Sequence, residues 1–337
     1  MSWRKIHESR SIGVGTMGRH HARVYSELPE ADLVAISDSD SIRADLTAAK
    51  FGIRAYTDHR EMLEKEKPDA VSVVVPTAMH EAVGMDALNA GCNVLIEKPI
   101  AATLDEGARL IEKARAMNKE LMIGHVVRFD PALQALKQKL DAGELGRIYQ
   151  IFCRRAGPFP TRIQDVGVVI DLAPHDVDIM RFLAGTNPTR AYSEIEQRIH
   201  TDHEDLLWAT LRFPDGIIGG LEINWLTPTK IREVCVLGER GMFRADALTQ
   251  DLYFYENSLV NDVQWATLQT IKGVSEGSMT RYAIPRFEPL KAELQSFLKA
   301  LQDGNPAPIT GEDGLAALKI SLALVESGRT HQVVDLQ

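Results

Sequence analysis

The sequence predicts an α/β plus α+β protein: a parallel sheet wrapped by helices, followed by a domain built on a large, mainly antiparallel open sheet. Three observations support this fold class. The chain has 337 residues, more than most single cores accommodate. In residues 1–124 short apolar runs alternate with helical segments. Later in the chain the runs are strand-like, with few helices between them.

The first domain is predicted to span residues 1–124. Its apolar runs are Leu33–Ile36, Ala70–Val75, Asn93–Ile96 and Glu120–Ile123. Residues 78–90 and 104–117 carry apolar residues at helical spacing. The carboxyl ends of parallel strands meet at one edge of the sheet, so we expect the loops after these runs to line one crevice.

The first strand of this sheet should lead into Gly13, yet residues 7–11 read His-Glu-Ser-Arg-Ser. A central parallel strand is normally apolar throughout, and burying Glu8 and Arg10 without partners would cost on the order of several kcal/mol. We therefore offer a coding hypothesis: the codons CAC GAG TCG CGG TCA, shifted by two bases, read Arg-Val-Ala-Val, which would be a normal first strand. Resequencing the coding DNA tests it. Otherwise we expect a strand that is shorter or more exposed than usual.

The second domain is predicted to span residues 125–337. Its strand-like runs are Ile148–Cys153, Leu206–Phe213, Ile217–Ile223 and Glu233–Leu237. Turn signals such as Pro214-Asp215-Gly216 separate neighbouring runs. Two helical stretches, at about residues 287–301 and 311–326, should close this domain.

Composition favours a soluble enzyme or binding protein over several other classes. The chain is 45% hydrophobic and 25% charged, and its formal net charge of -9 argues against a nucleic-acid partner. Cys92, Cys153 and Cys235 are odd in number and lack metal-ligand spacing, which indicates a reducing compartment. No apolar segment has the length of a membrane span or the character of a signal peptide. We therefore expect a cytoplasmic protein without membrane contact.

A GxGxxG turn follows the first predicted strand and opens a helix. Such a turn binds a dinucleotide pyrophosphate through its backbone and the helix start, although a plain glycine-rich turn has the same spacing. The cofactor-binding candidates in this turn are Gly13, Gly15, Thr16, Met17 and Gly18. Asp38 ends the next run, where a carboxylate can bind both ribose hydroxyls and repel a 2′-phosphate. Asp38 thus favours NAD over NADP, unless it is a helix N-cap.

Two later strand ends complete the predicted crevice. Thr77 and His80 follow one run and could meet the nicotinamide half of the cofactor, although an N-cap at Thr77 is equally compatible. Glu97-Lys98-Pro99 follows the next run and contributes Glu97 as a cofactor-binding candidate. A lysine at this edge faces the crevice and can relay a proton, whereas an exposed strand-end lysine is the alternative. Lys98–Pro99 is a candidate cis peptide bond.

Residues 169–180 read Val-Ile-Asp-Leu-Ala-Pro-His-Asp-Val-Asp-Ile-Met. If a helix begins near Asp171, Pro174 falls in its first turn, where the missing N–H costs little. Asp171, His175 and Asp178 then share one face, and a histidine oriented by an aspartate is poised as a general base. A structural histidine and a metal site are the alternatives. We predict no metal because no third His or Cys lies nearby.

Four arginines lie near these motifs. Arg154, Arg155 and Arg162 flank a Gly-Pro-Phe-Pro segment, and Arg128 follows the fourth apolar run. Arginine suits a bidentate grip on phosphate or carboxylate, so Arg128, Arg155 and Arg162 join Asp178 as candidate substrate contacts. A surface charge is the alternative for each arginine and is favoured for Arg154.

Together these motifs resemble the glucose-fructose oxidoreductase, inositol dehydrogenase and rhizopine-catabolism (Gfo/Idh/MocA) family over essentially the whole chain. GVGTMGRHH, IEKP, GHVVRFDP and DLAPHDVD stand in the expected order. The resemblance implies a Rossmann domain that binds NAD and a C-terminal open-sheet domain that forms a homodimer or homotetramer. It also implies Lys98, Asp171 and His175 as the catalytic set. The polar first strand departs from the family pattern.

Within that family, the stretch from Arg154 to Asp171 resembles the branch that oxidises the 3-hydroxyl of UDP-N-acetylglucosamine. A diphosphate needs cations, and Arg155 and Arg162 are available. The 3-keto product would suit a downstream aminotransferase. The alternatives are an inositol or free-sugar dehydrogenase, NAD-dependent glycoside hydrolysis, and a non-catalytic NAD-binding sensor.

Overall fold

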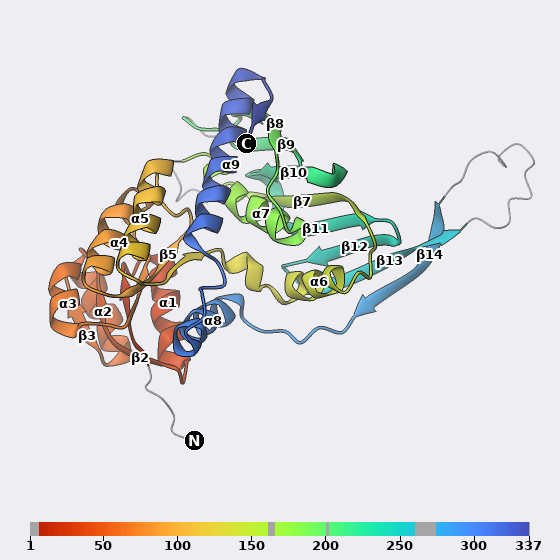
Figure 1. The fold of residues 1–337 in the computed structure, drawn as a ribbon. Coiled ribbons are helices and arrows are strands. Elements are labelled where there is room, and N and C mark those ends of the chain that lie inside the picture. The colour runs from red at the N-terminus through yellow and green to blue at the C-terminus, as the bar shows by residue number, and fades with distance from the viewer. Residues whose placement is uncertain (1–6, 161–165, 200–201, 260–273, 337) are drawn as a thin grey trace, which may run out of the picture. The chain divides into compact units, whose positions relative to one another are not determined.

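The computed structural model describes residues 7–160, 166–199, 202–259 and 274–336. The chain divides into two compact units (Figure 1). Unit 1 comprises residues 1–129 and 288–319, and unit 2 comprises residues 130–287 and 320–337. Unit 1 holds a six-stranded parallel sheet and unit 2 a nine-stranded, mainly antiparallel sheet, so the predicted fold class is confirmed.

The sheet of unit 1 has the order β3-β2-β1-β4-β5-β6. Its strands are β1 (His7–Ile12), β2 (Ala31–Ser37), β3 (Arg54–Tyr56), β4 (Ala70–Val73), β5 (Asn93–Glu97) and β6 (Leu121–Gly124). Its helices are α1 (Thr16–Glu27), α2 (Ser41–Phe51), α3 (His59–Glu66), α4 (His80–Asn89) and α5 (Leu104–Ala116), with the 3-10 turns η1 (Thr77–Met79) and η2 (Val126–Phe129). The strand order reverses between β1 and β4, which is where such sheets bind ligands.

The polar strand β1 lies in the middle of this sheet, so the expectation of a shorter or more exposed strand is wrong. It pairs in parallel with both β2 and β4, and Ser9, Arg10 and Ser11 are fully buried. The Arg10 guanidinium lies 3.5 Å from Glu66 and 3.1 Å from Glu8. These carboxylates offset the cost of burying the cation, which is why a polar strand can occupy a central position.

The segment after residue 287 returns to unit 1, whereas chain order alone had suggested that it closes the second domain. It contains α8 (Pro289–Asp303) and the start of α9 (Gly311–Thr330). Leu294 and Phe297 of α8 are fully buried, and the helix packs against α1 and η2. The Ile123 N–H of β6 donates to Ile309 O at 3.2 Å. These apolar and backbone contacts complete the first core.

The sheet of unit 2 has the order β14-β13-β12-β11-β7-β10-β9-β8-β15, and its β7–β10 pair is parallel. Its strands are β7 (Ile148–Pro158), β8 (Arg190–Glu196), β9 (Leu206–Arg212), β10 (Ile218–Asn224), β11 (Leu226–Gly238), β12 (Gly241–Asp246), β13 (Asp251–Leu259), β14 (Val274–Tyr282) and β15 (Val334–Asp335). Helix α7 (Val168–Ala184) packs on β7, β9 and β10, while α6 (Pro131–Asp141) packs on β12 and β13.

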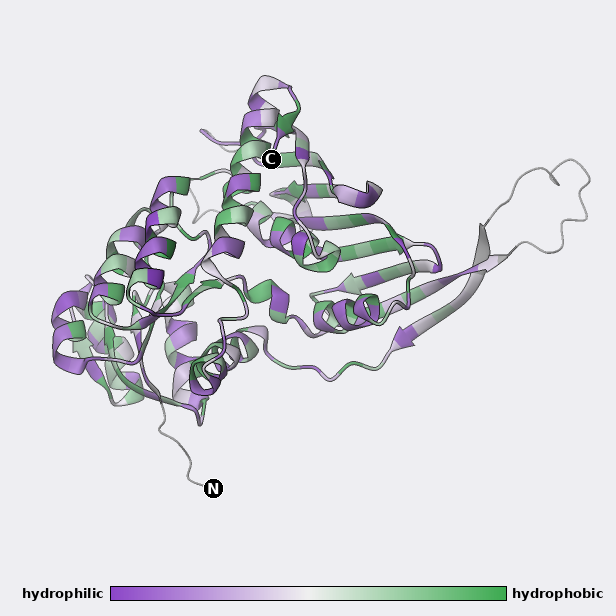
Figure 2. Ribbon diagram, in the orientation of Figure 1, coloured by the Kyte–Doolittle hydropathy of each residue, from purple (hydrophilic) through white to green (hydrophobic). Residues whose placement is uncertain are grey.

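Hydrophobic and hydrophilic residues alternate along strands of this sheet, as the green and purple bands indicate (Figure 2). Leu207, Ala209 and Val236 are buried on the face that α7 covers. The neighbouring positions on the opposite face hold exposed apolar side chains, among them Tyr192, Trp208, Ile218 and Leu237. Among the described residues, no helix is long and apolar enough to cross a membrane.

Candidate active site

The three fingerprint glycines of unit 1 have distinct physical roles. Gly13 has a φ of +85°, and a Cβ there would lie 2.3 Å from Val74 O. A Cβ on Gly18 would lie 1.9 Å from Gly13 O, so Gly18 allows α1 to approach the strand end. A Cβ on Gly15 would meet nothing within 4 Å. Gly15 therefore leaves open space where a pyrophosphate can approach the backbone.

Helix α1 begins directly after this turn. Its N-cap, Gly15, supplies no side-chain hydrogen bond, and Thr16 and Met17 form the first helical positions. The N–H groups and the positive dipole end of a helix start favour an anion. Met17 is exposed at this end of α1. The turn and the helix start thus fit the diphosphate of a dinucleotide.

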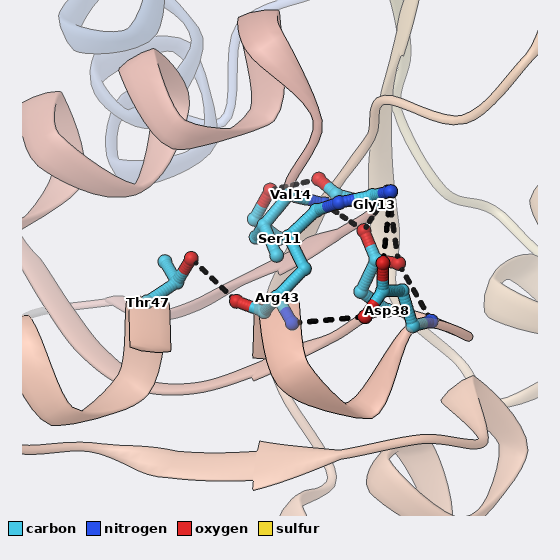
Figure 3. A network of polar contacts seen from close by, with 7 residues as sticks. Ser11, Gly13, Val14, Asp38, Arg43 and Thr47 are labelled. Atoms are coloured by element: carbon cyan, nitrogen blue, oxygen red, sulfur yellow. Dashed lines mark hydrogen bonds and ion pairs between the residues drawn. The ribbon is translucent and has the colours of Figure 1, made fainter. Parts of the chain in front are cut away.

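Asp38 follows β2 and bonds directly to the fingerprint (Figure 3). Its Oδ2 accepts the Val14 N–H at 2.8 Å, and its Oδ1 accepts the Asp40 N–H at 3.0 Å. The N-cap of α2 is Asp40, whose side chain accepts the Arg43 N–H, so the N-cap interpretation of Asp38 is wrong. The carboxylate lies beside the glycine turn, at the position expected for ribose binding.

Arg43 was not predicted as part of this site. Its Nη1 lies 3.2 Å from both carboxylate oxygens of Asp38, and its Nη2 donates to Asp40 at 3.1 Å (Figure 3). The Thr47 hydroxyl donates to the Arg43 carbonyl and anchors this turn of α2. Part of the signal was available, because Asp40 and Arg43 are three residues apart at the start of α2, a spacing that brings such side chains together.

Glu97 and Lys98 lie at the end of β5, and the Lys98–Pro99 bond is cis, as predicted. Glu97 Oε1 bonds to His21 Nε2 at 3.0 Å, and Glu97 Oε2 accepts the Lys98 N–H at 3.2 Å. Burial opposes ionisation of Glu97, but the His21 hydrogen bond and the charges of His21 and Lys98 hold its pKa below the usual value. Glu97 therefore links the fingerprint helix to the lysine loop.

His80 also supports this loop. Its Nδ1 lies 2.7 Å from Pro99 O and its Nε2 lies 3.0 Å from Val75 O, with the residue 1% exposed. Burial lowers the pKa of His80 against the raising effect of these carbonyls. Thr77 is half-buried at the start of η1, whose N-cap is Pro76, and α4 has Met79 as its N-cap. The N-cap interpretation of Thr77 is therefore wrong.

Two buried groups near Glu97 were missed by sequence reasoning. His21 belongs to α1, and Glu293 belongs to α8. Among the described residues, neither carboxyl oxygen of Glu293 has a hydrogen-bond partner. Burial, followed by the nearby charge of Glu97, raises the pKa of Glu293 well above its usual value. Burial and the neighbouring Glu97 charge thus favour the protonated form of Glu293.

In unit 2, α7 begins at Val168, three residues before the predicted start, and Pro174 lies inside the helix rather than in its first turn. The start is fixed by Glu204, which is distant in the chain. Its carbonyl accepts the Val168 N–H at 2.9 Å, and its carboxylate accepts the Val169 N–H at 3.3 Å. The first N–H groups of a helix have no partner within the helix. Because Glu204 accepts two of them, α7 can begin at Val168.

Asp171 and His175 lie four residues apart on α7 and are both half-buried, so they occupy one face of the helix. Asp178 is different, because it is 1% exposed and lies 3.6 Å from Arg181. The helix therefore presents an aspartate–histidine pair, while its third predicted polar residue is enclosed in the fold.

The predicted substrate arginines have structural partners. Arg155 Nε and Nη2 donate to the two carboxylate oxygens of Asp176 at 2.6 and 3.0 Å. In unit 1, Arg128 lies 3.3 Å from Asp313. Arg162 falls outside the described residues. Arg232 of β11, which was not predicted, stands opposite Arg155 in the β7–β11 register.

Both parts of the chain match known sequence families. Residues 11–125 match the oxidoreductase family with an NAD-binding Rossmann fold, and residues 133–244 match the GFO/IDH/MocA C-terminal domain. A UDP-N-acetylglucosamine 3-dehydrogenase from Acidithiobacillus ferrooxidans is 30% identical over 317 residues, which cover 93% of this chain and 96% of that protein. The scyllo-inositol 2-dehydrogenase (NAD(+)) of Bacillus subtilis is 28% identical over 339 residues, covering 96% and 95%.

A solved structure of the UDP-N-acetylglucosamine 3-dehydrogenase from Acidithiobacillus ferrooxidans aligns with a TM-score of 0.85 at 29% identity. The alignment covers 96% of this chain and 98% of that chain. The similarity therefore extends over both units and both sheets.

Proposed function

The chain belongs to the Gfo/Idh/MocA family as an NAD-binding sugar oxidoreductase, and we propose that it oxidises the 3-hydroxyl of UDP-N-acetylglucosamine to a ketone. Identity alone does not select this substrate, because the values of 30% and 28% for the two relatives are nearly equal. The observation that carries the proposal is Arg232 of β11, a half-buried arginine that hydrogen-bonds to backbone carbonyls and stands opposite Arg155 in the β7–β11 register. A nucleotide-sugar diphosphate needs such cations, and an uncharged cyclitol does not.

In the proposed mechanism His175 takes the proton of the sugar hydroxyl as general base. Asp171 orients the imidazole ring and stabilises its charged form. Lys98 hydrogen-bonds to the same sugar oxygen and relays the proton. Bound NAD supplies the hydride acceptor.

The residues of unit 1 hold the cofactor and the lysine in this proposal. The backbone between Gly13 and Gly18 approaches the diphosphate, and Asp38 binds the adenosine ribose. Glu97 and His80 fix the ends of the loop that carries Lys98, as their contacts with the Lys98 N–H and Pro99 O indicate. They act as positioning residues for Lys98.

An inositol dehydrogenase is the second candidate function, favoured by the 28% identity to the scyllo-inositol enzyme over 96% of this chain. The same His175, Asp171 and Lys98 would serve an inositol hydroxyl. In that case the arginines beside α7 would be structural.

We also propose that the chain forms a homodimer or homotetramer through the open face of the large sheet. Trp208 and Ile218 are 55% and 44% exposed on that face, and covering such apolar groups favours association. Light scattering after size-exclusion chromatography tests this, and a monomer at all concentrations would contradict it. The ketone product would serve an enzyme that transfers an amino group to a carbonyl.

The test of the proposed function is NADH absorbance with purified protein, NAD and a substrate panel. The panel contains UDP-N-acetylglucosamine, its uronic acid, free N-acetylglucosamine and myo-inositol, with 2-oxoglutarate added in parallel to reoxidise tightly held NADH. NADH formed only with UDP-N-acetylglucosamine supports the proposal. NADH formed only with inositol or the free sugar keeps the mechanism and rejects the substrate.

A further inference from the structure

Arg155 and Arg232 lie side by side on the sheet face that α7 covers. The antiparallel register of β7 and β11 pairs them directly. Val234 and Val236, which follow Arg232 at alternate positions, are 4% and 0% exposed, so Arg232 shares their face. Cys153 is fully buried two positions before Arg155 and marks the same face of β7. Directly paired residues bring their side chains close together.

The charges of these two arginines are balanced differently. Arg155 forms a bidentate ion pair with Asp176, whose side chain is 3% exposed. The Nη1 of Arg232 donates to Ala156 O at 2.7 Å and to Ile231 O at 2.6 Å, and both acceptors are neutral. Arg232 is half-buried. The positive charge of Arg232 is therefore partly desolvated. Its neighbour Arg155 already has a counter-ion in Asp176.

The arginines on the opposite face of the same sheet have carboxylate partners. Arg154 lies 2.9 Å from Glu222, and Arg281 donates to Asp251 at 2.7 Å. Arg244 pairs with Glu233 across β11 and β12. Arg232 differs from these three, because its hydrogen bonds go to backbone carbonyls and it lies on the covered face.

Electrostatics place Arg232 near the predicted catalytic pair. Burial and the charge of Arg155 lower the pKa of Arg232 to about 10, while the carboxylates of Asp176 and Asp171 raise it. Arg232 thus remains a cation at neutral pH. Asp171, one turn before His175 on α7, is close enough to act on it.

We propose that Arg232 is the substrate-anion contact of unit 2, which receives a phosphate oxygen of a nucleotide-sugar diphosphate. The proposal rests on the proposed function and deepens it by assigning the specificity-determining residue. A phosphate would match the charge of Arg232 through charge-assisted hydrogen bonds. A neutral cyclitol would offer no charge to match that of Arg232, and a site built for an anion discriminates against substrates lacking one.

The experiment compares Arg232→Gln and Arg232→Lys with Arg154→Gln, a matched control on the opposite face. Calorimetric titration with UDP measures diphosphate binding without turnover, and initial rates give KM and kcat for UDP-N-acetylglucosamine at saturating NAD. Arg232→Gln should raise the Kd for UDP and the KM about tenfold or more, the equivalent of one charge-assisted hydrogen bond. The Kd for UDP and the KM of Arg232→Lys should lie between those of Arg232→Gln and those of the unmodified protein. NAD binding and the Arg154→Gln values should stay unchanged.

The outcomes separate this proposal from the proposed function. Folded Arg232→Gln that binds UDP and turns over UDP-N-acetylglucosamine as the unmodified protein does would overturn the role of Arg232 and leave the function intact. UDP binding that depends on Arg232, without turnover of UDP-N-acetylglucosamine, would support Arg232 and reject the reaction. Absence of UDP binding to the unmodified protein would reject the anion contact. If Arg232→Gln does not fold, the Arg232→Lys titration decides, and an unchanged Kd would overturn the proposal.

Discussion

The cofactor turn of unit 1 and the α7 face of unit 2 use different chemical groups. Between Gly13 and Gly18 the groups are backbone amides, and Gly15 leaves open space beside them. On the α7 face the groups are side chains. The positive charge of Arg155 on β7 balances the carboxylate of Asp176 on α7. The first kind of site depends on the absence of Cβ atoms. The second depends on charge balance.

Replacing Lys98 should reduce turnover the most, because the proposed mechanism gives this unit 1 side chain a chemical role. Replacing Lys98 with Met should lower turnover by about 10³-fold, within the range of lost general acid–base catalysis. NAD affinity should stay near normal, since the glycine turn and Asp38 are intact. Initial rates and a fluorescence titration with NAD measure both, and Lys50→Met, an exposed change on α2, is the control. Undiminished turnover would remove Lys98 from the mechanism.

Breaking the charge balance of unit 2 should come next in size. Arg155→Met leaves Asp176 buried without its bidentate partner, which should cost about 3 kcal/mol of unfolding free energy. Arg43→Met breaks a pair whose arginine side chain is 44% exposed and should cost less than about 1 kcal/mol. Urea unfolding followed by circular dichroism compares the two variants. Equal losses of unfolding free energy in the two variants would contradict the larger contribution expected from the buried Arg155–Asp176 pair.

The backbone-built site is tested by two alanines in the same turn. Gly15→Ala should fold normally, because its Cβ meets nothing within 4 Å, yet weaken NAD binding about tenfold, or about 1.4 kcal/mol. Gly18→Ala should destabilise the fold itself, because its Cβ would lie 1.9 Å from Gly13 O. Thermal unfolding with and without NAD distinguishes the effects. Full NAD affinity in Gly15→Ala would contradict the backbone contact.

The effect of replacing Glu293 should grow with pH. Its pKa is raised in the folded state from an unfolded value near 4.5, so its contribution to stability is complete below that pH and is lost as pH rises towards the folded pKa. Glu293→Gln should therefore gain stability relative to the unmodified protein as the pH rises from about 5 to about 8. Unfolding at pH 5 and pH 8 measures this.

The control for that series is Glu64→Gln, an exposed carboxyl on α3. Its difference from the unmodified protein should not change between the two pH values. A Glu293→Gln difference that is likewise constant would mean that Glu293 is already ionised in the folded protein.

Much of unit 1 follows from the sequence, because its signals are local. The parallel sheet, the glycine turn and the cis Lys98–Pro99 bond each rest on neighbouring residues. The polar strand β1 was the exception. Its burial depends on Glu66, which lies 56 residues from Arg10 in the chain, and a local pattern holds no information about that partner.

The details of unit 2 depended on contacts between distant segments. The start of α7 is set by Glu204, 35 residues after the Val169 N–H that it accepts. Arg232 meets the Ala156 carbonyl across 76 residues, so its place beside α7 follows only from the pairing of β11 with β7. Helical spacing did place Asp171 and His175 on one face, because that relation lies within a single helix.

We propose that unit 1 holds NAD and that His175 of unit 2 performs the proton chemistry. A single-turnover measurement of NADH formation by His175→Asn, with saturating NAD and UDP-N-acetylglucosamine, tests both roles. We predict that NADH formation slows by about 10³-fold while the Kd for NAD stays unchanged. NADH formation at the rate of the unmodified protein, or loss of NAD binding in this variant, would contradict the claim.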